Sequence, residues 1–211
     1  VFGGQVRVSD LSFILNSYLK ATITSTGTNC IIGNNLINDP VISQGVVLGA
    51  KNVFSDNIYQ GSDDGAIVFI EDDCVVSGNV MIAGQFELTG KTNIVVSGNR
   101  AEGLSYDPNS GAGTQDNTVI SGNLFTQGII FHLPVGRNLK YSVIAGNTAA
   151  GMSVVDGAGA GENDKNCIVG NNIIDPLALG TSNLQVVGDR NQIVGNHIDG
   201  SAQIGSTSTA A

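Results

Sequence analysis

The sequence contains no tryptophan, and only 5% of its 211 residues are aromatic. Charged residues are also few, 13% in all, with 9 Lys and Arg against 18 Asp and Glu. The resulting formal net charge of −9 excludes the basic stripe that binding of a nucleic-acid backbone requires, and it disfavours an anionic membrane surface. No apolar run approaches the ~20 residues of a membrane-spanning helix, so we expect no membrane insertion.

Cysteine is scarce as well, and an initiator methionine and a signal peptide are missing, which predicts a processed chain or a fragment. The three cysteines, Cys30, Cys74 and Cys167, occupy the same position of the repeat described below but never in consecutive repeats. Their strands would therefore lie ~10 Å or more apart, which excludes a disulfide. We expect small buried side chains, no metal site and no cofactor.

The sequence is rich in a repeat that is centred on asparagine. Residues 117–125, NTVISGNLF, return in variants such as NCIIGNNLI from position 29 and NCIVGNNII from position 166. The shared asparagine recurs every 20 to 25 residues, at Asn35, Asn57, Asn79, Asn99, Asn123, Asn147, Asn172 and Asn196. A repeat of that length predicts a solenoid.

Each repeat predicts a strand, a tight bend and a second strand. Three residues before the asparagine stands Ile, Val or Phe in every repeat, and just before it stands Gly, Asn or Asp, which tolerate a left-handed backbone. β-branched residues ahead of the bend favour a strand over a helix. A third, less regular strand is expected at 21–25, 46–48, 67–70, 86–88, 129–133 and 154–155.

Stacking would place neighbouring asparagines ~4.8 Å apart, so that their side-chain amides bond one another along the axis. Buried asparagines without partners would each cost a few kcal/mol, and an internal ladder satisfies them. The alternative is that these asparagines are ordinary exposed turn residues.

The eight asparagines, with the Gly, Asn or Asp before each, resemble the repeats of the pectate-lyase-like superfamily of parallel β-helices. That superfamily includes polysaccharide lyases and hydrolases, alginate epimerases and bacteriophage tailspikes, and the chain looks most like a tailspike or tail-fibre domain. The resemblance implies an all-β, single-stranded right-handed parallel β-helix over residues 1–204, with a flexible tail or linker at 205–211. It says little about activity, because one solenoid carries many functions.

About nine rungs are expected. Leu11 takes the anchor place of the first, because residues 5–13 align with residues 73–81. A short amphipathic helix with Leu11, Ile14 and Tyr18 on one face is the alternative. A nine-rung solenoid would have no N-terminal cap, which favours a segment of a longer one. Pro, Ser and Gly predict the longest outward loop at 101–116, with further loops at 157–166 and 175–183.

A row of aliphatic side chains is expected on the outer surface. Strand alternation sends the residue four before each asparagine outward, and that position holds Ile31, Val53, Val75, Val95, Val119, Val143 and Ile168. Soluble monomers rarely leave so long an apolar patch uncovered. We therefore expect a homotrimer of parallel solenoids, as the resemblance to tailspikes implies, with these residues at the interface. Missing segments of the same polypeptide are the alternative cover.

The sequence contains no strong catalytic motif. The weak candidates are Asp72 and Asp73, with Arg100 one rung further on, because polyuronate lyases of this fold combine carboxylate-bound Ca²⁺ with a basic side chain. Glu87 is a candidate for one of the paired carboxylates of a glycoside hydrolase.

A sugar-binding surface is predicted at His132, Tyr106 and Arg137, which would supply hydrogen bonds and ring stacking; an ordinary surface histidine is the alternative. The first functional hypothesis is a trimeric tailspike-like domain, on a virion or extracellular, that recognises host surface polysaccharide. The second is a polysaccharide lyase or glycoside hydrolase of the same fold. The third is a purely structural shaft segment.

Overall fold

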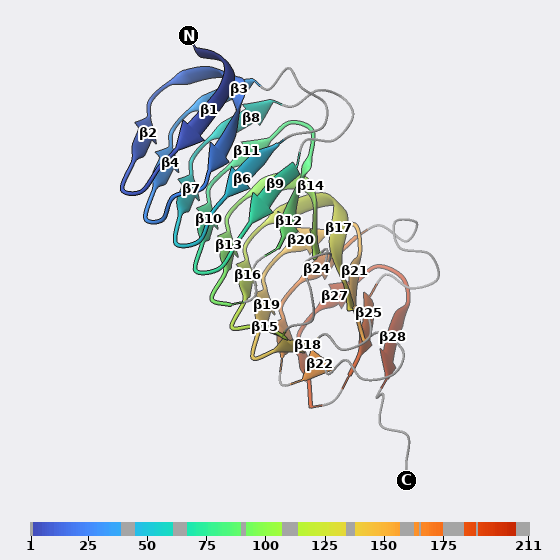
Figure 1. Cartoon of the computed structure of the whole chain (residues 1–211). Coiled ribbons are helices and arrows are strands. Elements are labelled where there is room, and N and C mark those ends of the chain that lie inside the picture. The colour runs from blue at the N-terminus through green and yellow to red at the C-terminus, as the bar shows by residue number, and fades with distance from the viewer. Residues whose placement is uncertain are drawn as a thin grey trace.

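The structure is a computed structural model that describes residues 2–38, 45–60, 67–89, 92–106, 114–133, 138–156, 163–164, 166–174, 184–188 and 190–205. Every regular secondary-structure element in these ranges is a β-strand. They pair in parallel and stack along one axis, so the described chain forms an elongated β-solenoid with β1 (Phe2–Val8) near one end and β28 (Ala202–Gly205) at the other (Figure 1). The all-β solenoid predicted from the repeat is confirmed.

One side of the solenoid is a nine-stranded parallel sheet with one short strand from each level. Its strands lie directly before the tight bend that precedes each repeated asparagine, which we call the ladder bend. In order along the axis they are β2 (Phe13–Leu15), β4 (Ile31–Gly33), β7 (Val53–Ser55), β10 (Val75–Ser77), β13 (Val95–Ser97), β16 (Val119–Ser121), β19 (Val143–Ala145), β23 (Cys167–Val169) and β26 (Gln192–Val194).

A sixteen-stranded sheet forms the remainder of the wall. The strands that follow the ladder bend are β5 (Leu36–Asn38), β8 (Ile58–Gln60), β11 (Val80–Met81), β20 (Thr148–Ala149), β24 (Asn172–Ile173) and β27 (His197–Ile198). The predicted third strands are confirmed as β6 (Val46–Leu48), β9 (Ile67–Ile70), β12 (Gln85–Leu88), β21 (Met152–Asp156) and parts of the long strands β3 (Tyr18–Ser25) and β17 (Leu124–Leu133). This sheet also contains β1, β14 (Arg100–Tyr106), β25 (Leu184–Val187) and β28.

A three-stranded sheet completes the later levels, with β15 (Thr114–Asp116), β18 (Asn138–Lys140) and β22 (Asn163–Asp164). The prediction of one long loop at 101–116 is therefore wrong at both ends, because β14 and β15 occupy them. Residues 107–113 and 175–183, and most of the loop predicted at 157–166, lie outside the described residues. Gly205, assigned to a tail, ends β28, and residues 206–211 also lie outside.

The internal asparagine ladder is confirmed. At Asn79, the backbone N–H and the side-chain Nδ2 both donate to Oδ1 of Asn99, each at 2.9 Å. Asn99 in turn donates from both groups to Asn123, at 2.9 and 3.0 Å. The same pair of bonds links each member to the next along Asn35, Asn57, Asn79, Asn99, Asn123, Asn147, Asn171 and Asn196. The buried amides are therefore satisfied by one another and by backbone carbonyls.

One member of the predicted ladder is wrong: Asn171, and not Asn172, occupies the anchor place. Asn147 Nδ2 donates to Asn171 Oδ1 at 3.0 Å, and β19 pairs with β23 so that Ile144 lies opposite Ile168. The residue with left-handed φ in this bend is Gly170, with φ 63°. In the nearly identical repeat at 29–37, Asn34 is the left-handed residue. A shift of one residue sends every side chain of a strand to the other face.

Because of this register, we expect alanine substitutions of the adjacent residues Asn171 and Asn172 to differ in their effect on stability. Asn171→Ala should lower the free energy of unfolding by about 4 kcal/mol, because it leaves buried donors and carbonyls of neighbouring levels unpaired. Asn172→Ala should change it by less than about 0.5 kcal/mol, since that side chain is half-exposed and outside the ladder. Urea denaturation of the two variants measures the difference, and equal losses would contradict the shifted register.

The first rung also differs from the prediction. β2 pairs with β4 so that Ile14 lies opposite Ile32, and the backbone N–H of Ser17 donates to Asn35 Oδ1 at 2.9 Å. Ser17 thus holds the anchor place, while Leu11 is 71% exposed in a turn. The alternative helix is wrong as well, because β2 and β3 cover that stretch. The levels at both ends are partly exposed. Nine strands stack in the nine-stranded sheet, but the described chain amounts to about six full turns, fewer than the nine rungs expected.

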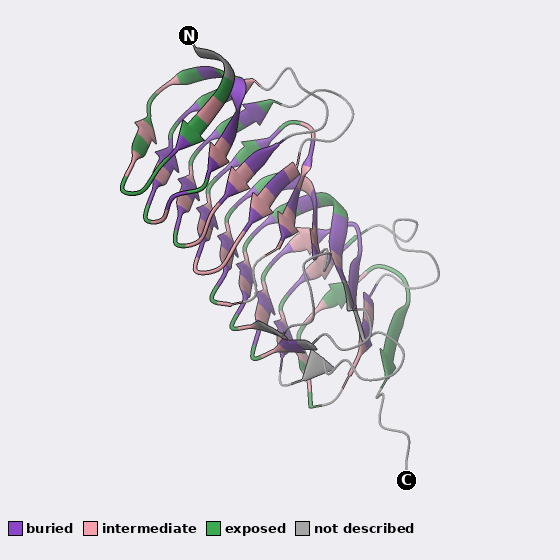
Figure 2. Cartoon of the chain, viewed as in Figure 1, coloured by how far each residue is buried: buried purple, intermediate pink, exposed green. Residues whose placement is uncertain are grey.

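The core is a set of columns that run along the axis, and on most short strands of the middle levels a buried position alternates with half-buried ones (Figure 2). The column three residues before each ladder position is fully buried through the middle of the stack: Ile32, Phe54, Val76, Val96, Ile120, Ile144 and Ile168. The predicted burial of the cysteines is confirmed for Cys30 and Cys74, which lie just before β4 and β10, and is wrong for Cys167, which begins β23 and is half-buried. Burial raises the pKa of the Cys74 thiol to about 11. That thiol stays protonated at neutral pH and is a poor nucleophile.

Candidate functional site

The outer face of the nine-stranded sheet carries two regular rows of side chains. Each middle strand shows one buried residue between two half-buried ones, because successive side chains point to opposite faces. The first outward position forms what we call the valine row: Phe13, Ile31, Val53, Val75, Val95, Val119, Val143 and Cys167. The second forms a serine row at Ser55, Ser77, Ser97 and Ser121.

This face is framed by short connections. Two residues separate β7 from β8, and the turn between β6 and β7 has four, residues 49–52. Parallel pairing in a constant register brings each valine directly above the next at ~4.8 Å. The face is therefore a straight apolar strip beside a strip of small hydroxyls.

Six of the seven residues predicted for an oligomer interface lie on this face, and Ile168 does not. Ile168 is fully buried in the core column, and half-buried Cys167 takes the outward position at that level. The physical reason is the one-residue shift at Asn171. Phe13, which is 65% exposed, joins this row because Ser17 and not Leu11 holds the anchor place of the first rung.

A second apolar row follows the ladder bend, on the sixteen-stranded sheet. We call it the post-ladder row, and its side chains are 37% to 46% exposed: Tyr18, Leu36, Ile58, Val80 and Leu124. Register pairs stack Leu36 on Ile58, and Ile58 on Val80. Arg100 stands between Val80 and Leu124 in the same row. The apolar residues after the asparagines were visible in the sequence, except for Tyr18, whose rung was misaligned.

The structure does not assemble the catalytic candidates into one site. Oδ1 of Asp72 accepts the backbone N–H of Thr92 at 2.8 Å, and Oδ1 of Asp73 accepts Nδ2 of Asn93 at 2.8 Å. Both carboxylates therefore cap the turn of the following level. Arg100 begins β14 beyond the ladder bend, at the opposite end of the nine-stranded sheet's strands, and is exposed.

Glu87 lies on a different strand position again, on β12 between Phe69 and Ser105 of the adjacent levels. Within the described residues, no group of three or more His, Cys, Asp or Glu side chains is placed to hold a metal ion. The described structure therefore does not bring Asp72, Asp73, Glu87 and Arg100 together.

The predicted sugar-binding group is not assembled either. Tyr106 is only 5% exposed, and its ring packs inside the solenoid against Phe131, with centroids 6.1 Å apart and an interplanar angle of 27°. The predicted exposure of Tyr106 is wrong because residues 101–106 belong to β14 and do not form a loop. The backbone of His132 lies in β17 opposite Val155, while its side chain and Arg137 fall outside the part of the chain that the structure describes.

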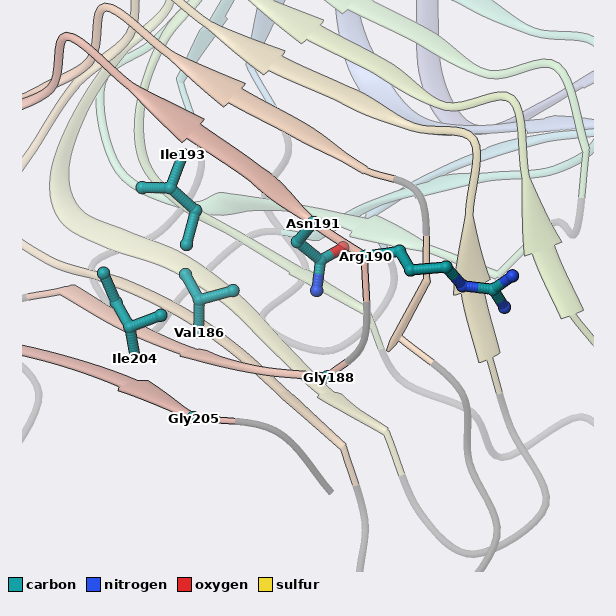
Figure 3. A pocket seen from close by; sticks show the side chains of 7 residues that line it. All are labelled: Val186, Gly188, Arg190, Asn191, Ile193, Ile204 and Gly205. Carbon is teal, nitrogen blue, oxygen red and sulfur yellow. The ribbon is translucent and has the colours of Figure 1, made fainter. Parts of the chain in front are cut away.

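Several cavities lie on the described surface. One, of about 340 Å³, lies near the C-terminal end of the described solenoid and is lined by buried Val186, half-buried Ile193 and exposed Ile204, among others (Figure 3). Another, of about 280 Å³, is the opposite open end beside Phe13 and Leu15. The third, of about 340 Å³, lies on the sixteen-stranded sheet and is lined by Leu124, Phe125, Thr126, Ala150 and Ile174.

No protein-family model, curated protein or solved structure matches the chain. The fold is therefore assigned from the hydrogen bonds and strand pairing of the chain, and the candidate site from the chemistry of its exposed side chains. In the described ranges, no helix has the length and apolar character needed to cross a membrane.

Proposed function

We propose that the chain is the β-helical part of a homotrimeric spike or fibre of the tailspike type, on a virion or outside a cell, that recognises surface polysaccharide. The observation that carries the proposal is the valine row, a straight strip of β-branched side chains on a face that short turns frame. Apolar strips of this length on soluble proteins are usually interfaces. The ladder beneath the strip keeps it rigid, which lowers the entropy lost on association.

The proposed recognition of polysaccharide is supported by the cavity beside Leu124 on the sixteen-stranded sheet. Its lining combines the exposed apolar side chains of Leu124 and Ile174 with the exposed polar residue Thr126. A volume of about 340 Å³ holds a small ligand, and apolar pockets with a few polar groups are typical binding sites. The net charge of −9 favours a neutral or amino-bearing glycan over a polyuronate.

We expect native mass spectrometry to find the chain as a trimer at micromolar concentration, and Val95→Lys to weaken assembly at least about 100-fold. A lysine in the middle of an apolar interface costs about 3 kcal/mol or more, because the charge loses its water without a partner. The control is Asn93→Lys, at an exposed turn position where Lys51 stands two levels earlier. A wild-type chain that remains monomeric contradicts the proposal.

A glycan array on the same sample separates the functional classes. Binding without cleavage supports recognition, and release of oligosaccharides from a capsule or pectin panel supports the alternative of a polysaccharide lyase or glycoside hydrolase. A trimer that binds no glycan supports a purely structural shaft.

A further inference from the structure

The two outward residues of each level of the nine-stranded sheet differ in size in a regular way. In five consecutive levels, from β7 to β19, the valine row supplies valine, and the second outward position supplies a small residue, which is serine four times and then Ala145. These strands lie one above another along the axis (Figure 1). The large side chains therefore form a ridge, and the small ones form a groove beside it.

The sixth level, β23, reverses the two sizes. Its residue in the valine row is Cys167, and its second outward residue is Val169; both are half-buried. Each of the six levels thus carries one valine and one smaller residue on its outer face. Side chains that project only into water are under no such restriction. A constant total size is what a closely packed neighbour requires, because interface cores are packed as densely as protein interiors.

The balanced stretch has clear limits. At the N-terminal level both outward residues are large, and Phe13 is 65% and Leu15 46% exposed. At the next level Gly33 follows Ile31 on the outer face, but Leu15 of the same chain occupies the space beside it, with its Cδ2 3.3 Å from where a Cβ would stand. The open groove therefore begins at Ser55, and the six levels from β7 to β23 span ~25 Å.

A second copy of this chain fits both the ridge and the groove. If ridge met ridge, the branched side chains would hold the two sheets apart and leave voids over the grooves, and such voids forfeit dispersion contacts. If the ridge of one copy enters the groove of the next, Val95 meets Ser97 of its neighbour and Cys167 meets Val169, so large meets small at all six levels. An unrelated partner would have to reproduce this order of sizes at the same ~4.8 Å interval, which a second copy already carries.

Closed symmetry also determines which levels meet. A ring of copies is generated by rotation alone, and rotation about an axis parallel to the solenoid leaves the height of every level unchanged. Each level therefore meets the same level of its neighbours. Contact between a ridge and a groove joins two unlike surfaces, and contacts of this kind close into rings such as a trimer.

We propose that the ridge of each copy packs into the groove of the next, level by level from β7 to β23, with the solenoids parallel. The inference rests on the self-association in the proposed function, and it adds that the groove, and not only the apolar ridge, belongs to the interface. It also assigns a role to the serine row, whose small side chains admit the neighbour's ridge.

Ser97→Val tests whether the groove is occupied. The substitution fills the groove at one level, so the concentration at which half of the chain is trimeric should rise at least about tenfold, as measured by native mass spectrometry of a dilution series. Valine favours strands and Ser97 is on the outer face, so far-ultraviolet circular dichroism should stay unchanged. Ser97→Ala is the matched control and should assemble as wild type, because it keeps the groove small. If Ser97→Val does not fold, Ser121→Val makes the same test one level further along.

An interface held by the apolar ridge alone predicts the opposite sign, because Ser97→Val would then enlarge the apolar surface and tighten assembly. A trimer that Ser97→Val leaves unchanged or tightens therefore overturns the inference while the proposed function stands. Equal weakening by Ser97→Ala overturns it as well, because the hydroxyl and not the size would then matter. A monomeric wild type overturns the proposed function and, with it, this inference.

Compensation tests which levels meet. Val95→Ala shortens the ridge at the level that Ser97→Val fills, so the double variant should assemble to within about threefold of wild type. Val95→Ala combined with Ser55→Val places the two changes two levels apart and should assemble no better than Ser55→Val alone. If the two double variants assemble equally well, the parallel packing of equal levels is overturned.

Discussion

Replacing Asn99 by alanine is expected to lower the free energy of unfolding by about 4 to 6 kcal/mol. Oδ1 of Asn99 accepts both donors of Asn79, and its Nδ2 donates to the carbonyl oxygens of Val76 and Ser97 as well as to Asn123. Alanine leaves these buried groups unpaired, and each costs about 1 to 3 kcal/mol. The ladder is continuous, so the loss falls on levels on both sides of the substitution.

The matched control is Ser97→Ala, two residues away on the outer face, which should change the free energy of unfolding by less than about 0.5 kcal/mol. Urea denaturation at one fixed protein concentration measures both variants, because association would shift the midpoint. Hydrogen exchange at the amides of Asn79 and Asn123 shows whether the neighbouring levels open. A loss below about 1 kcal/mol would mean that water or a rearranged side chain satisfies the ladder.

Most of the fold could be predicted because each level repeats the same physical requirement. A left-handed bend, an inward asparagine and an inward aliphatic residue recur at fixed offsets, and the alternation of strand side chains then places Val53 to Val143 outside. The register predictions are wrong where the same residues are compatible with two strand registers. In GNN at positions 170–172, either asparagine can follow a left-handed residue, and only pairing with β19 decides between them.

The misplaced candidate-site residues have a common cause, which is that local composition did not reveal tertiary pairing. Tyr106 follows Gly103 and stands two residues before Pro108, yet pairing of β14 with β12 and β17 draws it into the core. The register shift between Ala101 and Gly103 in β14 hides its alternation. Asp72 and Asp73 are carboxylates of the kind a lyase needs, but carboxylates also cap turns, and their hydrogen bonds show that second role.

Phe54→Ala is expected to lower the free energy of unfolding by about 4 kcal/mol, since removing a fully buried aromatic side chain loses its contacts and leaves a cavity. Phe54 is the one aromatic residue in a column of isoleucines and valines, between Ile32 and Val76 on the adjacent strands. These short strands are fixed by hydrogen bonds along the axis and cannot collapse onto the space, so the cavity should persist.

Phe54→Leu tests that reasoning, because a branched aliphatic residue matches the rest of the column and should cost only about 1 kcal/mol. Ser55→Ala, the adjacent outward residue, is the control for the substitution itself. Thermal denaturation with hydrogen exchange at Ile32 and Val76 measures how far the loss spreads, and in a solenoid it should stay near the altered level. If Phe54→Ala and Phe54→Leu lose the same small amount, the column is loosely packed, and the ladder alone fixes the spacing of the levels.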